Sequence, residues 1–284
     1  MGTQEITSED RFIDIDGIRT HLRIKGTGQP LVLVHGLGGP LMWQKIFDPL
    51  ARHFQVVILD LPGYGDSNPP QKNFSTDDYA GFLYRCIGEL NLKKIHLCGI
   101  SYGGHISATF AAHHGNIIDS LILIGSTGLM PRPFFLLNNF LLAPSIFFID
   151  HIILRSELIM CRMGARSFYN IGNRPSDLCH QFFIQLSKDG RRKIWLNSLQ
   201  NIFSDQLKFR KILAALRVRT LIVWGENDMT ASHEYAEEFH RLIAGSTIIT
   251  YGKCGHSVPL EYPEELCTDI LNFINCTSNE NITS

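Results

Sequence analysis

The order of apolar and polar positions predicts buried strands that alternate with helices along most of the chain. Five apolar runs of strand length, each followed at once by a glycine, an aspartate or a His-Gly pair, lie at 31–34, 56–59, 95–98, 121–124 and 221–224. Strands that are apolar on both faces are typical of a parallel sheet covered by helices. Helix-like stretches lie between these runs, for example at 76–90 and 106–114. The pattern predicts a βαβ series and therefore an α/β fold.

Two stretches depart from this alternation. Residues 12–24 alternate around Asp16 and Gly17, which predicts an antiparallel hairpin. Residues 128–215 contain no clean strand run, and their pattern is helical throughout. We therefore expect one core domain built from residues 1–127 and 216–284. Residues 128–215 are expected to form a helical cap, or lid, inserted over the C-terminal edge of the sheet.

Composition is that of an ordinary globular chain. The 284 residues are 44% hydrophobic and carry a formal net charge of −1, which excludes a uniformly basic nucleic-acid binder. The first residues show no secretory signal, and the most apolar stretch, 133–154, holds polar residues that make it a poor membrane span. The seven cysteines are scattered without a C-x-x-C pair. We expect reduced thiols, no disulfide framework and a cytoplasmic protein.

Charge is distributed unevenly along the chain. The segment 128–215 has 12 Lys+Arg and 5 Asp+Glu, a balance of +7, so the remaining residues have 14 and 22, a balance of −8. One interpretation is that the cap attracts an anionic substrate or an acidic carrier protein. A solvated helical surface explains the charge equally well. An amphipathic lid that touches a membrane is a further alternative, whereas stable membrane insertion and nucleic-acid binding are not expected.

The segment 99–104, Gly-Ile-Ser-Tyr-Gly-Gly, is the strongest chemical signal. It follows a predicted strand and opens a predicted helix, the context in which a G-x-S-x-G pattern presents a serine nucleophile. Such a serine stands on a tight, strained turn, so its neighbours must be small. Alternatively, Ser101 caps a helix on a glycine-rich loop that binds phosphate. A Walker loop is excluded, because no Lys-Ser or Lys-Thr follows the glycines.

A serine nucleophile needs a base, an acid that orients the base, and donors for the oxyanion. His256 follows a glycine in the loop after the last strand, 247–251, and is our candidate base. Asp228 follows the strand 221–224 and is the candidate acid, with Glu226 as its local competitor. The order serine, aspartate, histidine is the one expected for this arrangement. The backbone amides of Leu37 and Tyr102 are the candidate oxyanion donors.

Further residues are candidates for contacts with substrate. They come from the loop after the first apolar run and from the cap: His35, Gly36, Phe134, Phe147, Arg155 and Arg162. Other titratable residues have structural interpretations: we expect His105 to pack against the sheet, and Asp60 and Asp66 to shape their loop. No metal and no cofactor is expected.

Together these motifs resemble the α/β-hydrolase family over about residues 12–273. The resemblance rests on His35-Gly36, the segment 60–67, the serine turn, the segment 225–228 and Gly255-His256. It implies an eight-stranded, mostly parallel sheet with a cap inserted after the sixth strand. Dehalogenases and epoxide hydrolases of the family carry aspartate as nucleophile, which Ser101 argues against. Hydrolases of ring-fission products typically have Asn before the nucleophile and Trp after the histidine, where this chain has Ile100 and Ser257.

The family resemblance implies a serine hydrolase with a Ser101–His256–Asp228 triad. We expect it to cleave a small carboxylic ester or related acyl bond through an acyl-enzyme. Two alternatives remain open: a carbon–carbon bond hydrolase that acts on a vinylogous diketone, and a non-catalytic member of the fold that binds a small ligand.

Overall fold

The computed structural model describes residues 8–129, 147–204 and 206–276. Eight strands form one sheet in the order β1-β2-β4-β3-β5-β6-β7-β8. The strands are β1 (Ser8–Ile15), β2 (Ile18–Lys25), β3 (Pro30–Val34), β4 (Gln55–Leu59), β5 (Ile95–Ile100), β6 (Ile118–Ile124), β7 (Thr220–Gly225) and β8 (Thr247–Tyr251). All five apolar runs of the sequence lie in strands, so the predicted α/β fold with a mostly parallel eight-stranded sheet is confirmed.

The hairpin at the start of the sheet is antiparallel and the remainder is parallel. β1 pairs with β2, and β2 with β4, in antiparallel fashion, whereas every pairing from β4 to β8 is parallel. The turn between β1 and β2 has φ of 54° at Asp16 and 79° at Gly17. A two-residue turn with both φ values positive matches the twist of the flanking strands, which explains the Asp-Gly pair.

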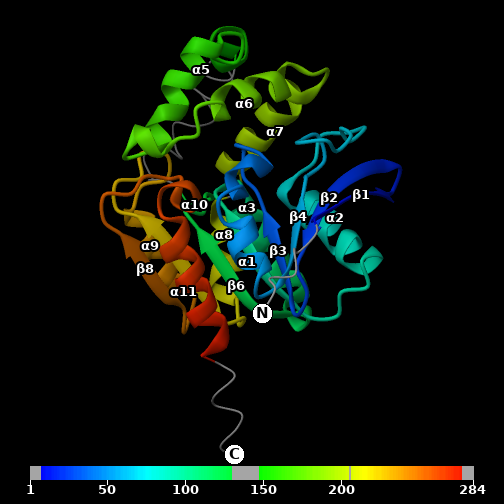
Figure 1. The fold of residues 1–284 in the computed structure, drawn as a ribbon, viewed down its shortest axis with the longest axis vertical. Coiled ribbons are helices and arrows are strands. Elements are labelled where there is room, and N and C mark those ends of the chain that lie inside the picture. Colours follow the sequence, from blue (N-terminus) through cyan, green and yellow to red (C-terminus); the bar gives the residue numbers. More distant parts are fainter. Residues whose placement is uncertain (1–7, 130–146, 205, 277–284) are drawn as a thin grey trace, which may run out of the picture.

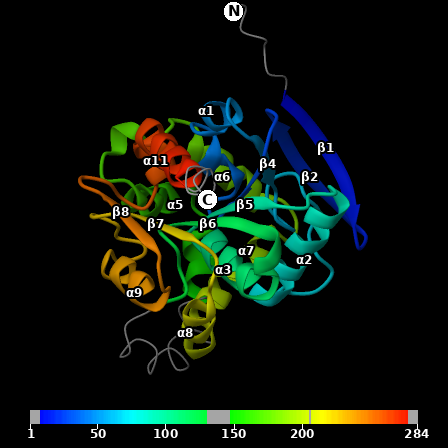
Figure 2. The same ribbon diagram turned by 90° about the horizontal axis from the view of Figure 1, so that it is seen from below.

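Helices cover both faces of the sheet (Figure 2). One face carries α1 (Phe47–Ala51) and α11 (Pro263–Asn275), and the other carries α2 (Thr76–Glu89), α3 (Tyr102–His114), α8 (Gln206–Ala215) and α9 (Glu234–Leu242). Side chains of alternate strand positions fill two separate cores between the sheet and these helices. Helix α2 begins at a capping box of Ser75 and Asp78.

The segment between β6 and β7 is helical where it is described. It contains α5 (Glu157–Gly164), α6 (Leu178–Ser187) and α7 (Arg191–Phe203), which lie above the ends of the strands in Figure 1. Helix α8 falls within the predicted cap but contacts α3 and α9 beside the sheet. Its Phe209 packs on His105 with ring centroids 3.9 Å apart, so His105 lies against α8 where we expected the sheet.

The cysteines are not all free. Cys161 of α5 and Cys179 of α6 form a disulfide, with 5.6 Å between their Cα atoms, so the expectation of seven reduced thiols is wrong for this pair. The other five cysteines are free. No helix in the described ranges is long and apolar enough to cross a membrane.

Candidate active site

Ser101 stands at the turn between β5 and α3. Its φ is 57°, a left-handed conformation that costs a non-glycine residue free energy. Its amide donates to the carbonyl of Ile124 at 2.9 Å, and its carbonyl accepts from the amides of Gly104 and Thr127. These bonds hold the strained turn against the end of β6.

Two glycines allow the backbone to close around this turn. A β-carbon on Gly103 would lie 2.1 Å from the carbonyl oxygen of Val34. A β-carbon on Gly36 would lie 2.7 Å from Cβ of Ser101. Neither contact is sterically possible, so both positions require glycine. The structure therefore places Gly36 against the serine side chain, and its predicted contact with substrate stays a prediction.

Asp228 holds the imidazole of His256. Its Oδ2 lies 2.6 Å from Nδ1 of His256, and the two side chains are 0% and 8% exposed. Its Oδ1 accepts the amides of Thr230 and Ala231 at 2.7 and 2.8 Å, which fixes the carboxylate. Glu226 is exposed, so of the two acids considered it is Asp228 that binds the histidine.

The remaining nitrogen of His256, Nε2, is buried and has no hydrogen-bond partner among the described residues, so no hydrogen bond joins it to Ser101 in this structure. A β-carbon on Gly125 would lie 3.1 Å from Nδ1 of His256, and Gly125 directly follows Ile124, which binds the amide of Ser101. The end of β6 thus contacts both residues. The structure brings Ser101, Asp228 and His256 to the same end of the adjacent strands β5 to β8.

Glu261 organises the loop that carries His256, and the sequence analysis missed it. It lies in the short helix α10 (Val258–Glu261) and is 8% exposed. Oε1 accepts the amide of Gly255 at 2.8 Å, and Oε2 accepts the amides of Tyr169 and Asn170 at 2.9 and 3.0 Å. One carboxylate therefore ties the histidine loop to the cap. The only signal in the sequence is an acidic residue directly after the apolar run 258–260.

The two predicted oxyanion donors lie near the serine in different ways: Tyr102 directly follows it, and Leu37 follows Gly36, where a β-carbon would lie 2.7 Å from Cβ of Ser101. Tyr102 is the first residue of α3, so its amide has no acceptor within the helix. Leu37 lies in the loop after β3. The carbonyl of Gly36 accepts from Nδ1 of His35 at 2.8 Å and from the amide of Gly39 at 3.1 Å. Since N–H and C=O of a trans peptide point in opposite directions, the Leu37 amide points away from that pair.

His35 is a positioning residue for this loop. Its Nδ1 donates to the Gly36 carbonyl, and its Nε2 accepts the amide of Leu61 at 3.1 Å, which assigns the neutral tautomer. Burial lowers the pKa of His35 to about 4, so the ring stays neutral at pH 7. It is 0% exposed and holds the loop from within the core, and its predicted contact with substrate stays a prediction.

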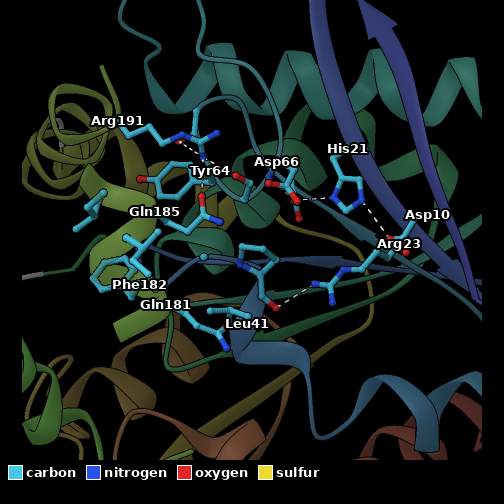
Figure 3. A pocket seen from close by; sticks show the side chains of 18 of the residues that line it. Asp10, His21, Arg23, Leu41, Tyr64, Asp66, Gln181, Phe182, Gln185 and Arg191 are labelled. Carbon is cyan, nitrogen blue, oxygen red and sulfur yellow. Dashed lines mark hydrogen bonds and ion pairs between the residues drawn. The ribbon is translucent and has the colours of Figure 1, made fainter. Parts of the chain in front are cut away.

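A cavity of about 570 Å³ lies between the hairpin, the loop after β3 and the cap helices α6 and α7 (Figure 3). Gly38 and Gly39, next to Leu37, form one wall, whereas Ser101 and His256 do not line it. The cavity is therefore adjacent to the serine site. Its charged lining residues are Asp10, His21, Arg23, Asp60, Asp66 and Arg191.

Three of these residues cluster closely enough to consider a metal. One ligand atom each from His21, Asp60 and Asp66 lies within 4.8 Å of the others. Nδ1 of His21, however, lies 2.8 Å from Asp60, and its Nε2 lies 3.2 Å from Asp10 (Figure 3). The hydrogen bond with Asp60 raises the pKa of His21. Both ring nitrogens of His21 thus lie beside carboxylate oxygens, so the described contacts of the cluster are those of an ion-pair network.

The predicted substrate-binding residues of the cap are exposed where they are described, and their contact with substrate stays a prediction. Phe134 lies outside the described residues. Phe147 is 63% exposed, and Arg155 and Arg162 are exposed on the cap. None of these three lines the cavity beside the loop after β3. Arg155 instead borders a smaller cavity of about 380 Å³ with Lys188, Arg192 and Lys193.

Contacts between the inserted segment and the core account for part of the difference in charge between them. Lys188 pairs with Asp66, Lys208 with Asp77, and Arg210 with Glu238. Arg191 donates to the carbonyls of Gly65 and Ser67 at 2.6 and 3.2 Å and is 9% exposed. These four cations attach the inserted segment to the core. Arg155, Arg192 and Lys193 border the smaller cavity together with Lys188 and the two carboxylates of Asp150 and Asp189, so the cavity lining carries more positive than negative charge.

Comparison with known proteins agrees with this geometry. The model of the alpha/beta hydrolase fold family matches residues 29–146. The 2-hydroxy-6-oxo-6-(2'-aminophenyl)hexa-2,4-dienoic acid hydrolase of Metapseudomonas resinovorans is 26% identical and covers 94% of this chain and 91% of its own. The 2-hydroxy-6-oxononadienedioate/2-hydroxy-6-oxononatrienedioate hydrolase of Escherichia coli O81 (strain ED1a) is 29% identical and covers 96% and 97%.

A solved structure shows the same fold. The crystal structure of a serine hydrolase involved in carbazole degradation superposes with a TM-score of 0.80 at 24% identity, over 95% of this chain and 100% of that one. The sheet order, the serine turn after β5 and the matched family model lead to one assignment. The chain has the α/β-hydrolase fold, and its residues 29–146 match the model of that family.

Proposed function

We propose that the chain is a serine hydrolase that cleaves a carbon–carbon bond beside the ketone of a 2-hydroxy-6-oxodienoate, a product of aromatic-ring fission. The observation that carries the proposal is its similarity, over more than nine-tenths of both chains, to two hydrolases named for such dienoates. This supports the carbon–carbon interpretation, held as an alternative from the sequence, better than the ester interpretation. The geometry around Ser101 suits either bond.

In this proposal Ser101 is the nucleophile, His256 the base and Asp228 the acid that orients it. Nε2 of His256 takes the serine proton as Oγ attacks the ketone carbon. The negative oxygen then accepts hydrogen bonds from the amides of Leu37 and Tyr102. Asp228 holds Nδ1–H and stabilises the imidazolium, and its own position is fixed by two backbone amides.

Bond changes in this scheme balance with water as the only co-substrate. The carbon–oxygen bond to Ser101 forms, and the carbon–carbon bond breaks with its electron pair on the departing carbon. This requires the keto form R–CO–CH₂–CH=CH–CO–COO⁻, made when the 2-hydroxyl proton moves to C5; its 2-keto group takes up the electron pair as a dienolate, and the proton held by His256 converts the dienolate oxygen into the 2-hydroxyl. Water, deprotonated by His256, then hydrolyses the acyl-enzyme. The net reaction converts R–CO–CH=CH–CH=C(OH)–COO⁻ and water into R–COOH and CH₂=CH–CH=C(OH)–COO⁻.

The cap suits a substrate that carries a carboxylate. In this proposal the cations of the smaller cavity, Arg155, Lys188, Arg192 and Lys193, outnumber its carboxylates, Asp150 and Asp189, and attract an anion. The larger cavity adjoins the oxyanion loop and has room for a molecule of this size. Alternatively, the same cations bind an acidic carrier protein. We also propose that the protein is cytoplasmic.

Ester hydrolysis is the second candidate, and one observation favours it. Ile100 and Ser257 occupy the positions where ring-fission hydrolases typically have Asn and Trp. Ile100 is 1% exposed within the core on one face of the sheet, and Ser257 is also 1% exposed. Neither side chain is placed to contact a dienoate, so recognition of the substrate would have to come from other residues.

The test is to incubate the purified protein with a 2-hydroxy-6-oxo-6-phenylhexa-2,4-dienoate. Hydrolysis removes the conjugated chromophore and releases benzoate and a 2-hydroxypentadienoate in equal amounts. We expect this in the wild type and its loss in Ser101→Ala. An unchanged spectrum with the wild type, together with rapid hydrolysis of p-nitrophenyl butyrate, would replace the proposal with the ester alternative.

A further inference from the structure

Helix α7 of the cap contacts the core along one face. Arg191, Ile194, Trp195 and Asn201 are spaced at intervals that place them on the same side of a helix. Arg191 binds the 63–67 loop, and Ile194 packs where a β-carbon on Gly63 would lie 2.5 Å from its Cδ1. The remaining two residues contact the serine site.

Trp195 donates a hydrogen bond to the loop that carries the first oxyanion donor. Its Nε1 lies 3.1 Å from the carbonyl oxygen of Leu37. The preceding peptide is held through its Gly36 carbonyl by His35 and Gly39. Hydrogen bonds therefore fix the peptide planes on both sides of the Leu37 α-carbon, one set from the core and one from the cap.

Asn201 contacts the second donor residue. Its Nδ2 lies 2.9 Å from the hydroxyl of Tyr102 and 2.8 Å from the carbonyl of Phe74. The Tyr102 hydroxyl also lies 3.3 Å from Oγ1 of Thr76. One cap helix thus contacts both residues whose amides face the developing oxyanion.

The loop after β3 needs such an external restraint. Glycines at 36, 38 and 39 surround Leu37, and glycine gives a backbone wide conformational freedom. An oxyanion donor is effective only when it is held in place before the reaction, because reorientation during the reaction costs free energy. The hydrogen bond from His35 fixes the peptide that precedes Leu37 and leaves the ψ angle of Leu37 free. The bond from Trp195 restrains that angle.

We propose that α7 positions the oxyanion donors. The positioning residue is Trp195, which acts through its indole N–H. This inference rests on the proposed function, because it assumes that the Leu37 and Tyr102 amides hold an oxyanion. It implies that the cap contributes to transition-state stabilisation as well as covering the site. Loss of the indole N–H should then reduce turnover while leaving substrate binding unchanged.

Trp195→Phe removes the N–H and keeps an aromatic ring. Trp195→Gln removes the ring and keeps an N–H the same number of bonds from Cβ. Asn197→Ala is the matched control, because Asn197 lies on the same helix and, among the described residues, its side chain binds the Phe74 carbonyl, at 2.6 Å, and not Leu37 or Tyr102. Thermal melting of each variant identifies any loss of folding.

The readouts are the rate at which a fluorophosphonate labels Ser101, and kcat and KM for p-nitrophenyl butyrate. Labelling passes through an oxyanion and does not depend on the natural substrate. We expect Trp195→Phe to lower the labelling rate and kcat by about tenfold with KM nearly unchanged. Trp195→Gln should retain most of the rate and Asn197→Ala nearly all of it.

Equal rates in the wild type and Trp195→Phe would overturn the inference and leave the proposed function standing. Equal losses in Trp195→Phe and Trp195→Gln, or a comparable loss in Asn197→Ala, would also overturn it, because the cap would then act through packing alone. Absence of labelling in the wild type would overturn the proposed function and this inference with it.

Discussion

The carboxylate of Asp228 lies 2.6 Å from Nδ1 of His256, and its second oxygen is occupied by two backbone amides. The acid is therefore fixed before the reaction, and it occupies Nδ1 of His256, so Nε2 is the ring nitrogen left without a partner among the described residues. This relationship connects residues 28 positions apart in the sequence and supports the proposed triad.

Asp228→Asn should lower kcat by about 10³- to 10⁴-fold, because an amide at this position favours the wrong tautomer of His256. Steady-state kinetics on the dienoate and on p-nitrophenyl butyrate measure the effect. Glu226→Gln is the matched control: Glu226 is exposed, so its kinetics should equal those of the wild type. Full activity in Asp228→Asn would remove Asp228 from the mechanism.

Glu261→Gln should also reduce kcat, here by about tenfold or more. A glutamine has one acceptor oxygen and a donor amide, so it cannot accept from Gly255, Tyr169 and Asn170 together. The histidine loop would shift while Ser101 itself stays in place. Kinetics combined with thermal melting separate this effect from general loss of stability, and wild-type kinetics in this variant would show that the loop is held by other contacts.

Stability should fall as the pH is lowered from about 6.5 towards 4. Burial lowers the pKa of His35 and His96 to about 4 and that of His105 to about 3, from an ordinary value of 6.5. Between these values the unfolded chain binds more protons than the folded chain, so acid favours unfolding. His21 has a raised pKa and acts in the opposite direction, because its contribution is lost as pH rises above 6.5.

His105→Leu tests this assignment. In urea unfolding at a series of pH values, the free energy of unfolding should fall less steeply below pH 6.5 than in the wild type. The difference in slope should correspond to about one proton. Near pH 8, where His105 is neutral in the folded and unfolded states, the free energy of unfolding should vary with pH in the same way in the variant and the wild type. An identical fall in the free energy of unfolding below pH 6.5 in both proteins would mean that His105 does not contribute to that fall.

Thiol titration tests the disulfide. Without reductant, the unfolded protein should expose five thiols, and after reduction seven, because Cys161 and Cys179 are paired and the other five cysteines are free. Cys161→Ser should lower the free energy of unfolding by roughly 3 kcal/mol, the loop-closure value for a separation of this length. Seven thiols before reduction would show that the pair is open in solution.

Ionic strength should distinguish anionic from neutral substrates. If Arg155, Arg192 and Lys193 attract a carboxylate, kcat/KM for the dienoate should fall as salt rises from 0.02 to about 0.5 M, because the Debye length shortens over this range. The value for neutral p-nitrophenyl butyrate should change little. Replacing the three cations with alanine should remove the salt dependence, and equal salt dependence for both substrates would reject the attraction.

Much of the fold was accessible from the sequence because its signals are local. Apolar runs that end in a glycine or an aspartate predicted the strands, and Asp16-Gly17 predicted the hairpin turn. Ser101, Asp228 and His256 each follow a predicted strand of the parallel part of the sheet. Parallel strands bring their carboxyl ends to one edge, so the positions of these three residues along the chain were enough to predict that they share it.

The supporting residues could not be predicted in the same way. Trp195 and Leu37 are 158 residues apart, and nothing in the local pattern of α7 indicates that the indole points to that loop. Arg191 counted as an attractor for anions in the sequence, whereas the structure uses it to bind backbone carbonyls. Such roles depend on how the cap packs on the core, which periodicity does not encode.

The central claim is that the chain cleaves a carbon–carbon bond, and the most direct measurement is a ratio of two specificity constants. One preparation is assayed with a 2-hydroxy-6-oxodienoate and with p-nitrophenyl butyrate, and the values of kcat/KM are compared after subtraction of the Ser101→Ala background. We predict that the dienoate is preferred by about 100-fold or more. A ratio below about one would contradict the account and identify the chain as an ester hydrolase.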